Sequence, residues 1–319
     1  MKRLIRTLII RLKGLPILSQ LLDWSKRFVI PGFSGVPVYY VIRFILQETQ
    51  KDNLTTRANS IAFSFFLSIF PAIIFIFTLL PYLPFTADYT ELVSNTLEKV
   101  LPENIHQYLM SIILDITSIK RQGLLSAGIL LTIFFSSSGM LTLMYGFDKS
   151  YSTTFKNRGY LKKYAIAITL TFTLILLLLG SISIFLSTKY LLSLFHISPY
   201  SPGIAGFLVK LIKSFFAFAI VYLGVSLIYK HGPSLKKKTA LINPGSLLTT
   251  TLLILASFLF SYFINNFGRY NEIYGSIGAL MAFMLYLQIT AFILLVGFEL
   301  NAAIAVNRDL MEEDEDFWD

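Results

Sequence analysis

The sequence has no cysteine among its 319 residues, which excludes disulfides, thiolate nucleophiles and cysteine-ligated metals. Its only histidines, His106, His196 and His231, lie far apart and share no metal-ligand spacing. The sequence also lacks a P-loop and a glycine-rich dinucleotide fingerprint, so ATP-driven pumping by this chain alone is excluded. We therefore expect no catalytic residue, no metal site and no cofactor, and we expect that the chain is not an enzyme.

Charge is scarce as well. Only 14% of the residues are charged and 55% are hydrophobic, with a mean hydropathy of +0.67. A soluble domain carries about 25% charged residues, because its surface faces water. The surface of this chain therefore requires another solvent, and lipid is the natural one.

Long apolar runs are what the sequence does contain. A helix needs about 20 apolar residues to cross the hydrocarbon core of a bilayer. Six stretches qualify: Ile61–Leu83, Leu124–Tyr145, Tyr164–Ser187, Phe207–Tyr229, Pro244–Ile264 and Tyr274–Ala303. They predict an all-α fold, a polytopic transmembrane helical bundle of about six spans.

The regions on either side of the spans are polar or amphipathic. We expect residues 1–56 to form a cytoplasmic, interfacial segment with N-terminal amphipathic helices, one of them over Val36–Thr56, where Val38, Val41 and Ile45 recur on one stripe. Residues 57–304 would form the transmembrane domain. Residues 305–319 would form an acidic, disordered cytoplasmic tail, with docking to a partner as the alternative role.

Basic residues are distributed unevenly over the connectors. Most of them precede the first span or lie in the second and fourth connectors. The positive-inside rule then places both termini in the cytoplasm, which agrees with an even number of spans. The net charge of +9 is accounted for by these loops, so nucleic-acid binding is not needed to explain it.

Four motifs resemble the YihY/BrkB family of bacterial inner-membrane proteins. They are TTRANSIAFSFFLSIFP at the first span, SSSGMLTLMYGFDKSY at the end of the second, NPGSLLTT at the fifth, and the Tyr274–Ile304 stretch with its Gly-x-Glu-Leu-Asn ending. The resemblance implies a six-span protein of the bacterial inner membrane with cytoplasmic termini. Some family members carried the label ribonuclease BN, others were called virulence factors, and recent proposals favour transport of lipid or envelope precursors.

The ribonuclease label can be compared with the residues. Metal-dependent cleavage of a phosphodiester needs clustered histidine and carboxylate ligands. This sequence offers scattered histidines and no acidic pair on any predicted span. A ribonuclease is therefore the least favoured alternative.

Ionisable residues near the span ends are the candidate functional residues. We predict a cytoplasmic charge cluster in which Arg57 pairs with Asp148, Glu299 or both and closes or shapes an inner vestibule. The alternative is a static salt bridge that fixes helix packing. The predicted supporting polar side chains are Tyr145, Gln288 and Asn301. At the outer side, Lys189, Lys210 and Lys213 are candidates for contact with an anionic headgroup, with ordinary snorkelling as the alternative.

These features favour a transporter or flippase-like handler of an amphiphilic, anionic envelope lipid or precursor. The alternative is a non-transporting scaffold for envelope biogenesis. The expected partners are membrane lipids, with a homo-oligomer or an envelope-protein partner in addition, and no nucleic acid. A cavity between helices that is accessible to lipid would favour transport, and a solid bundle would favour the scaffold.

Overall fold

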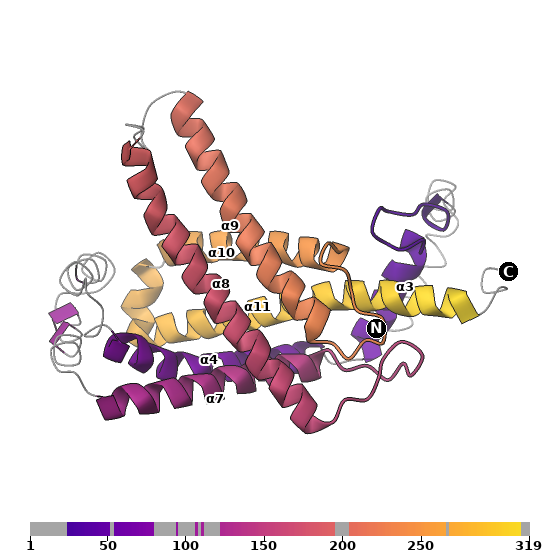
Figure 1. Ribbon diagram of the computed structural model, residues 1–319, viewed down its shortest axis with the longest axis horizontal. Helices are drawn as coiled ribbons and strands as arrows, with labels where there is room; N and C mark the ends of the chain where they lie inside the picture. The colour runs from indigo at the N-terminus through magenta and orange to yellow at the C-terminus, as the bar shows by residue number, and fades with distance from the viewer. Residues whose placement is uncertain are drawn as a thin grey trace.

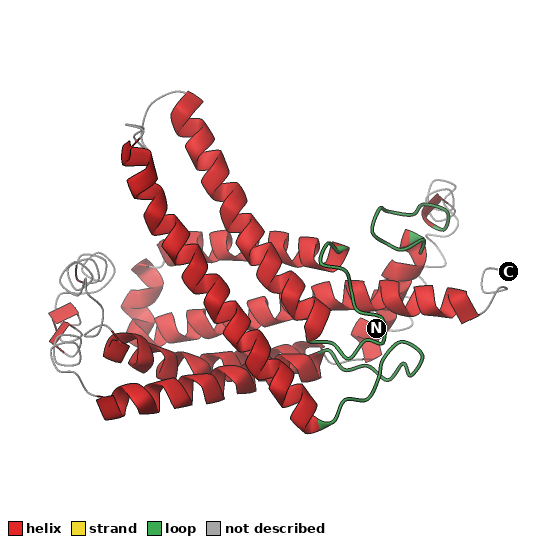
Figure 2. Cartoon of the chain, viewed as in Figure 1, coloured by secondary structure: helices red, strands yellow, loops and turns green. Residues whose placement is uncertain are grey.

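The computed structural model describes residues 24–51, 54–79, 94, 106–107, 110–111, 122–194, 204–265 and 268–313. Within these ranges the chain is mostly helical, with loops between the helices, and forms no strand (Figure 2). The long helices are α3 (Val38–Lys51), α4 (Leu54–Leu79), α7 (Gln122–Gly146), α8 (Tyr160–Leu194), α9 (Ile204–His231), α10 (Pro244–Asn265) and α11 (Gly268–Glu313). The all-α prediction is confirmed.

The six helices from α4 to α11 are each long and apolar enough to cross a membrane. Each contains one of the six predicted stretches, apart from small differences at the ends. The charge-free runs identified them because a buried or lipid-facing helix tolerates few ionisable groups. The amphipathic helix predicted before the first span is α3.

The spans form a closed circuit of contacts. Each one packs against the next in the sequence, and α11 returns to pack against α4. In Figure 1, α8 and α9 run obliquely across the other four spans. This arrangement brings the start of α4, the end of α7 and the later part of α11 together at one end of the molecule.

That end is here called the basic end. It comprises loop 147–159 between α7 and α8, loop 232–243 between α9 and α10, and the helix ends that adjoin them. Most of the buried apolar side chains lie there, including Ile61, Leu143, Tyr229 and Phe298. The opposite halves of the spans, here called the far end, expose rows of large apolar side chains. Rows of this kind suit contact with lipid tails.

The sequence-based boundary at residue 304 differs from the structure. The expected disordered tail begins too early, because α11 continues as a helix to Glu313. Ala305 and Val306 are buried, and α11 packs against α3, which contributes buried Val41 and Phe44. Small apolar residues just beyond the span thus dock the amphipathic helix and keep this segment ordered. Residues 1–23 and 52–53 of the predicted N-terminal segment and residues 314–319 of the predicted tail lie outside the described residues.

Candidate functional site

A buried ion pair lies at the centre of the basic end. The Nζ of Lys149, in loop 147–159, is 2.7 Å from Oε1 of Glu299 on α11, and the two side chains are only 2% and 0% exposed. Removing two charges from water is expensive unless they compensate each other. The pair therefore ties loop 147–159 to α11.

Asp148 has a different partner from the neighbouring Lys149. Its Oδ2 is 2.5 Å from Nζ of Lys163 on α8. The same Nζ lies 4.6 Å from the centre of the Tyr145 ring, at cation–π distance. Tyr145 and Asp148 thus fix Lys163 between α7 and α8.

Arg57 lies at the same end, near the start of α4. Its Nη1 donates a hydrogen bond of 3.3 Å to the carbonyl of Gly146, the last residue of α7. All three residues of the predicted charge cluster therefore lie at the basic end. The pairing of Arg57 with either carboxylate stays a prediction.

Sequence reasoning identified both carboxylates but missed their lysines. Lys149 and Lys163 entered only as loop charges that set the orientation of the chain. A carboxylate near the end of a span requires a cation nearby. This requirement was the signal in the sequence that could have predicted a lysine partner. Which lysine pairs with which carboxylate depends on how loop 147–159 turns back toward α11.

Asn301, predicted as a supporting polar residue, holds the start of α10. Its Oδ1 accepts from the backbone N–H of Gly245 at 3.0 Å, and its Nδ2 donates to Oδ1 of Asn243 at 2.8 Å. Asn243 in turn caps the helix by accepting from the N–H of Ser246 at 2.8 Å. The asparagine pair therefore joins the start of α10 to α11.

The same two helices approach closely at glycines. A Cβ added to Gly297 would lie 1.7 Å from Oγ1 of Thr249 and 2.6 Å from the Tyr229 hydroxyl. That hydroxyl donates to the carbonyl of Leu294 at 2.7 Å and lies 2.6 Å from Oγ1 of Thr249. The Gly-x-Glu-Leu-Asn motif thus supplies a close approach, an ion pair and a helix cap.

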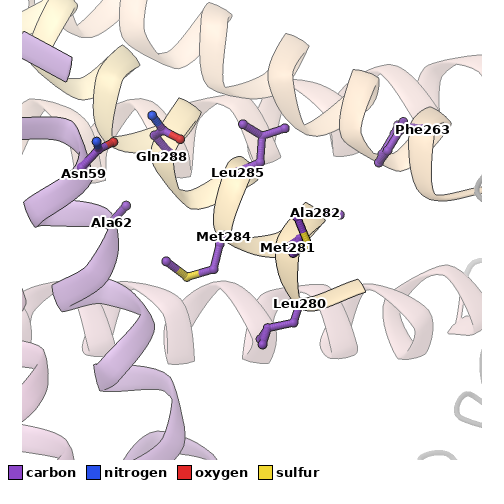
Figure 3. A pocket seen from close by; sticks show the side chains of 9 residues that line it. All are labelled: Asn59, Ala62, Phe263, Leu280, Met281, Ala282, Met284, Leu285 and Gln288. Atoms are coloured by element: carbon purple, nitrogen blue, oxygen red, sulfur yellow. The ribbon is translucent and has the colours of Figure 1, made fainter. Parts of the chain in front are cut away.

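Gln288, the third predicted polar residue, lines a cavity of about 620 Å³ between α4, α10 and α11. Figure 3 shows Gln288 and Asn59 at one end of this cavity, and Phe263 and Leu280 at the other. Most of the remaining lining is apolar, from Met281, Met284 and Leu285. This space is called the lateral cavity below.

Of the three predicted headgroup lysines, Lys210 and Lys213 are not among the residues that line the lateral cavity. Lys210 is exposed and Lys213 half-buried on the far half of α9, and the side chain of Lys189 lies outside the described residues. Among the residues that the structure describes, no group of three His, Asp or Glu side chains could hold a metal ion.

Six apolar helices in a closed circuit, with apolar side chains facing outward, define a polytopic α-helical membrane protein. Residues 45–317 match the family described as Virulence factor BrkB, and the chain belongs to that family. This confirms the resemblance found in the sequence.

Several relatives span nearly the same length. A Bacillus subtilis (strain 168) protein described as ribonuclease-like, YfkH, is 25% identical over 85% of this chain and 95% of its own. A UPF0761 membrane protein of Coxiella burnetii (strain Dugway 5J108-111) is 23% identical over 83% of this chain and 93% of its own. The UPF0761 membrane protein MS0032 of Mannheimia succiniciproducens is 24% identical over 81% of this chain and 87% of its own. No solved structure is significantly similar to this chain.

Proposed function

We propose that this protein is a transporter or flippase-like handler of an amphiphilic, anionic lipid or envelope precursor in the bacterial inner membrane. It has no catalytic activity, and both termini lie in the cytoplasm. The lateral cavity is the observation that carries this proposal. Its volume of about 620 Å³ falls within the range of small-molecule sites, and its apolar walls suit an acyl chain.

The polarity of the cavity changes along its length. α11 runs from the far end toward the basic end, so Leu280 lies nearer the far end than Gln288 does. The two amides, Asn59 and Gln288, therefore lie nearer the basic end than Phe263 and Leu280, which line the other end of the cavity (Figure 3). An amphiphile with its polar group at the amides and its chain toward the far end matches this gradient.

Between the two amides and the basic end, the bundle is closed. Gln288 and Glu299 share a face of α11, since 11 residues complete about three helical turns. Beyond Gln288 along that face lies the Lys149–Glu299 pair, beside the buried apolar core of the basic end. Passage from the cavity to the basic end would require this pair to separate, which makes it the natural inner gate.

The name of the Bacillus relative raises ribonuclease activity as another function. No cluster of acid and histidine residues in the described part of the chain favours it.

The anionic character of the substrate rests on the basic residues around the ends of the spans, not on the cavity itself, whose polar groups are neutral amides.

A cavity-filling substitution tests the proposal. Leu285→Trp on α11 would place an indole in the cavity, while Leu176→Trp adds the same group to an exposed position on α8 that does not line it. We expect lipids that co-purify with the wild-type protein to be lost in Leu285→Trp and retained in Leu176→Trp, as measured by mass spectrometry. Co-purified lipids that match the bulk membrane in all three proteins would oppose the proposal and favour the scaffold.

A further inference from the structure

The two loops of the basic end join into one unit. Phe155 and Leu235 form an isolated antiparallel bridge. On either side of it the N–H of Lys156 donates to the carbonyl of Ser234 at 2.8 Å, and the N–H of Lys236 donates to that of Thr154 at 2.9 Å. Loop 147–159 is thereby fixed against loop 232–243, at the ends of α7 and α9.

Arg158 anchors this unit to the end of α9. Its Nη1 donates to the carbonyl of His231 at 3.0 Å and to that of Gly232 at 3.1 Å. The residue is only 8% exposed. Burial lowers the pKa of its guanidinium and the nearby charge of Asp148 raises it, but an arginine remains a cation at any physiological pH.

Arg158 also lines two separate hollows. One is a polar cavity of about 340 Å³, which Lys156, Asn157, Ser152 and Lys163 line as well. The other is a groove of about 270 Å³ between α8 and α9, with His231 and Lys238 among its basic residues and Leu170 and Leu227 among its apolar ones. Arg158 therefore forms part of the wall of both.

The hydrogen bonds of Arg158 leave donors for a ligand. A guanidinium carries five N–H groups in a planar fork, and this geometry suits phosphate oxygens. Within the described residues, the hydrogen bonds of Arg158 all come from Nη1. Nε and Nη2 are therefore the donors left for a ligand. The side chain that carries them is more than nine-tenths buried and borders both hollows.

The remaining charges favour an anion. Asp148 is the acidic residue of the polar cavity, and it is already paired with Lys163. Lys156 in the cavity and Lys238 in the groove are exposed, and each adds positive charge beside Arg158. The basic lining thus exceeds what the single carboxylate can balance.

We infer that Arg158 is the centre of a phosphate-binding site, with Lys156 contributing on the cavity side and Lys238 on the groove side. The phosphate could belong to a soluble anion, which the polar cavity would hold. It could equally belong to a phospholipid whose chains follow the apolar residues of the groove. The site is separate from the lateral cavity and does not depend on transport.

Binding to the full-length protein in a neutral detergent tests this inference. The two probes are inorganic phosphate, followed by calorimetry, and phosphatidylglycerol in mixed micelles, followed by native mass spectrometry. We expect at least one probe to bind, and Arg158→Gln to weaken that binding by at least about tenfold, since hydrogen bonds to charged groups are strong. Lys156→Ala should weaken binding of inorganic phosphate, and Lys238→Ala should weaken binding of phosphatidylglycerol.

Lys236→Ala is the matched control. Lys236 is exposed in the same loop and lines neither hollow, so its loss should leave binding unchanged. If Arg158→Gln does not purify as a folded protein, the exposed Lys156 and Lys238 variants decide the question. Absence of binding by the wild-type protein, unchanged binding in these variants, or an equal loss in Lys236→Ala would each overturn the inference. The lateral cavity and its tryptophan variants are unaffected by any of these results.

Discussion

The basic end and the far end of the same six spans are built differently. At the basic end, side chains from α4, α7, α9 and α11 are buried together, and a buried ion pair, an asparagine pair and a close glycine contact join the helices. At the far end the helices present exposed apolar residues, such as Phe215 on α9 and Phe258 on α10. Phe263 and Leu280, which line the apolar part of the lateral cavity, lie on this side.

The difference indicates which part of the bundle is fixed. Directional contacts hold helices in one geometry, whereas apolar surfaces slide in lipid with little change in free energy, because lipid tails are as apolar as the side chains. We therefore expect the basic end to act as the rigid base and the far end as the adaptable part. The predictions below aim at the contacts of the base, from the largest expected effect to the smallest.

The Lys149–Glu299 pair should have the largest effect. Lys149→Met would leave the Glu299 carboxylate buried without this cation, and breaking a buried pair in this way costs about 3–5 kcal/mol. We expect a large fall in the melting temperature of the purified protein, measured by thermal unfolding in detergent. Glu299→Gln should act in the same direction.

The double variant Lys149→Met/Glu299→Leu is the control for this prediction. Because the double variant removes both charges of the pair, neither is left buried without the other. The double variant should therefore be more stable than Lys149→Met alone. Strictly additive losses in melting temperature would show that the two side chains act independently. The pair could then not serve as the inner gate.

The glycine contact between α10 and α11 should rank second. In Gly297→Ala the new methyl would overlap Thr249 and the Tyr229 hydroxyl, so α11 would have to move away from α9 and α10. Overpacking of this kind costs about 1–3 kcal/mol. We expect a lower melting temperature and a lower yield of monodisperse protein.

Gly180→Ala on α8 is the matched substitution for that test. A Cβ at Gly180 would meet nothing within 4 Å, so the stability should hardly change. Equal losses at both glycines would mean that the effect comes from the helix backbone and not from the close approach at the basic end.

The basic end also shows where the sequence was informative. Six charge-free runs predicted the spans, because membrane crossing imposes that pattern locally. Glu299 and Asp148 stood out for the same reason, as charges near the ends of apolar runs. The partners Lys149 and Lys163 could not be assigned, because that required the path of loop 147–159.

Two other features depended on tertiary contacts. Asn301 was predicted as a polar side chain that supports the charge cluster, yet its hydrogen bonds go to the start of α10, which is distant in the sequence. The extension of α11 to Glu313 depends on packing against α3, which the hydropathy of the span does not encode. The periodicity of the sequence predicts helices, whereas which helices pack against each other is known only from the fold.

The asparagine pair should rank third. Asn301→Ala removes the acceptor for the Gly245 N–H and the donor to Asn243, at a helix start where cap residues contribute about 0.5–2 kcal/mol. We expect a moderate fall in melting temperature. Asn59→Ala, at an exposed position in the lateral cavity, should change stability by less than about 0.5 kcal/mol. A larger effect at Asn59 than at Asn301 would contradict a rigid base at this end.

The contact of Lys163 with Tyr145 should have the smallest effect, since the Tyr145 side chain is 44% exposed. A cation–π contact at an exposed site contributes about 0.5–1 kcal/mol, so Tyr145→Leu should lower the melting temperature only slightly. Tyr145→Phe keeps the ring and should match the wild type. A loss in Tyr145→Leu as large as in Lys149→Met would place the main constraint on Lys163 and α8. The rigid base would then be the contact between α7 and α8 and not the buried pair on α11.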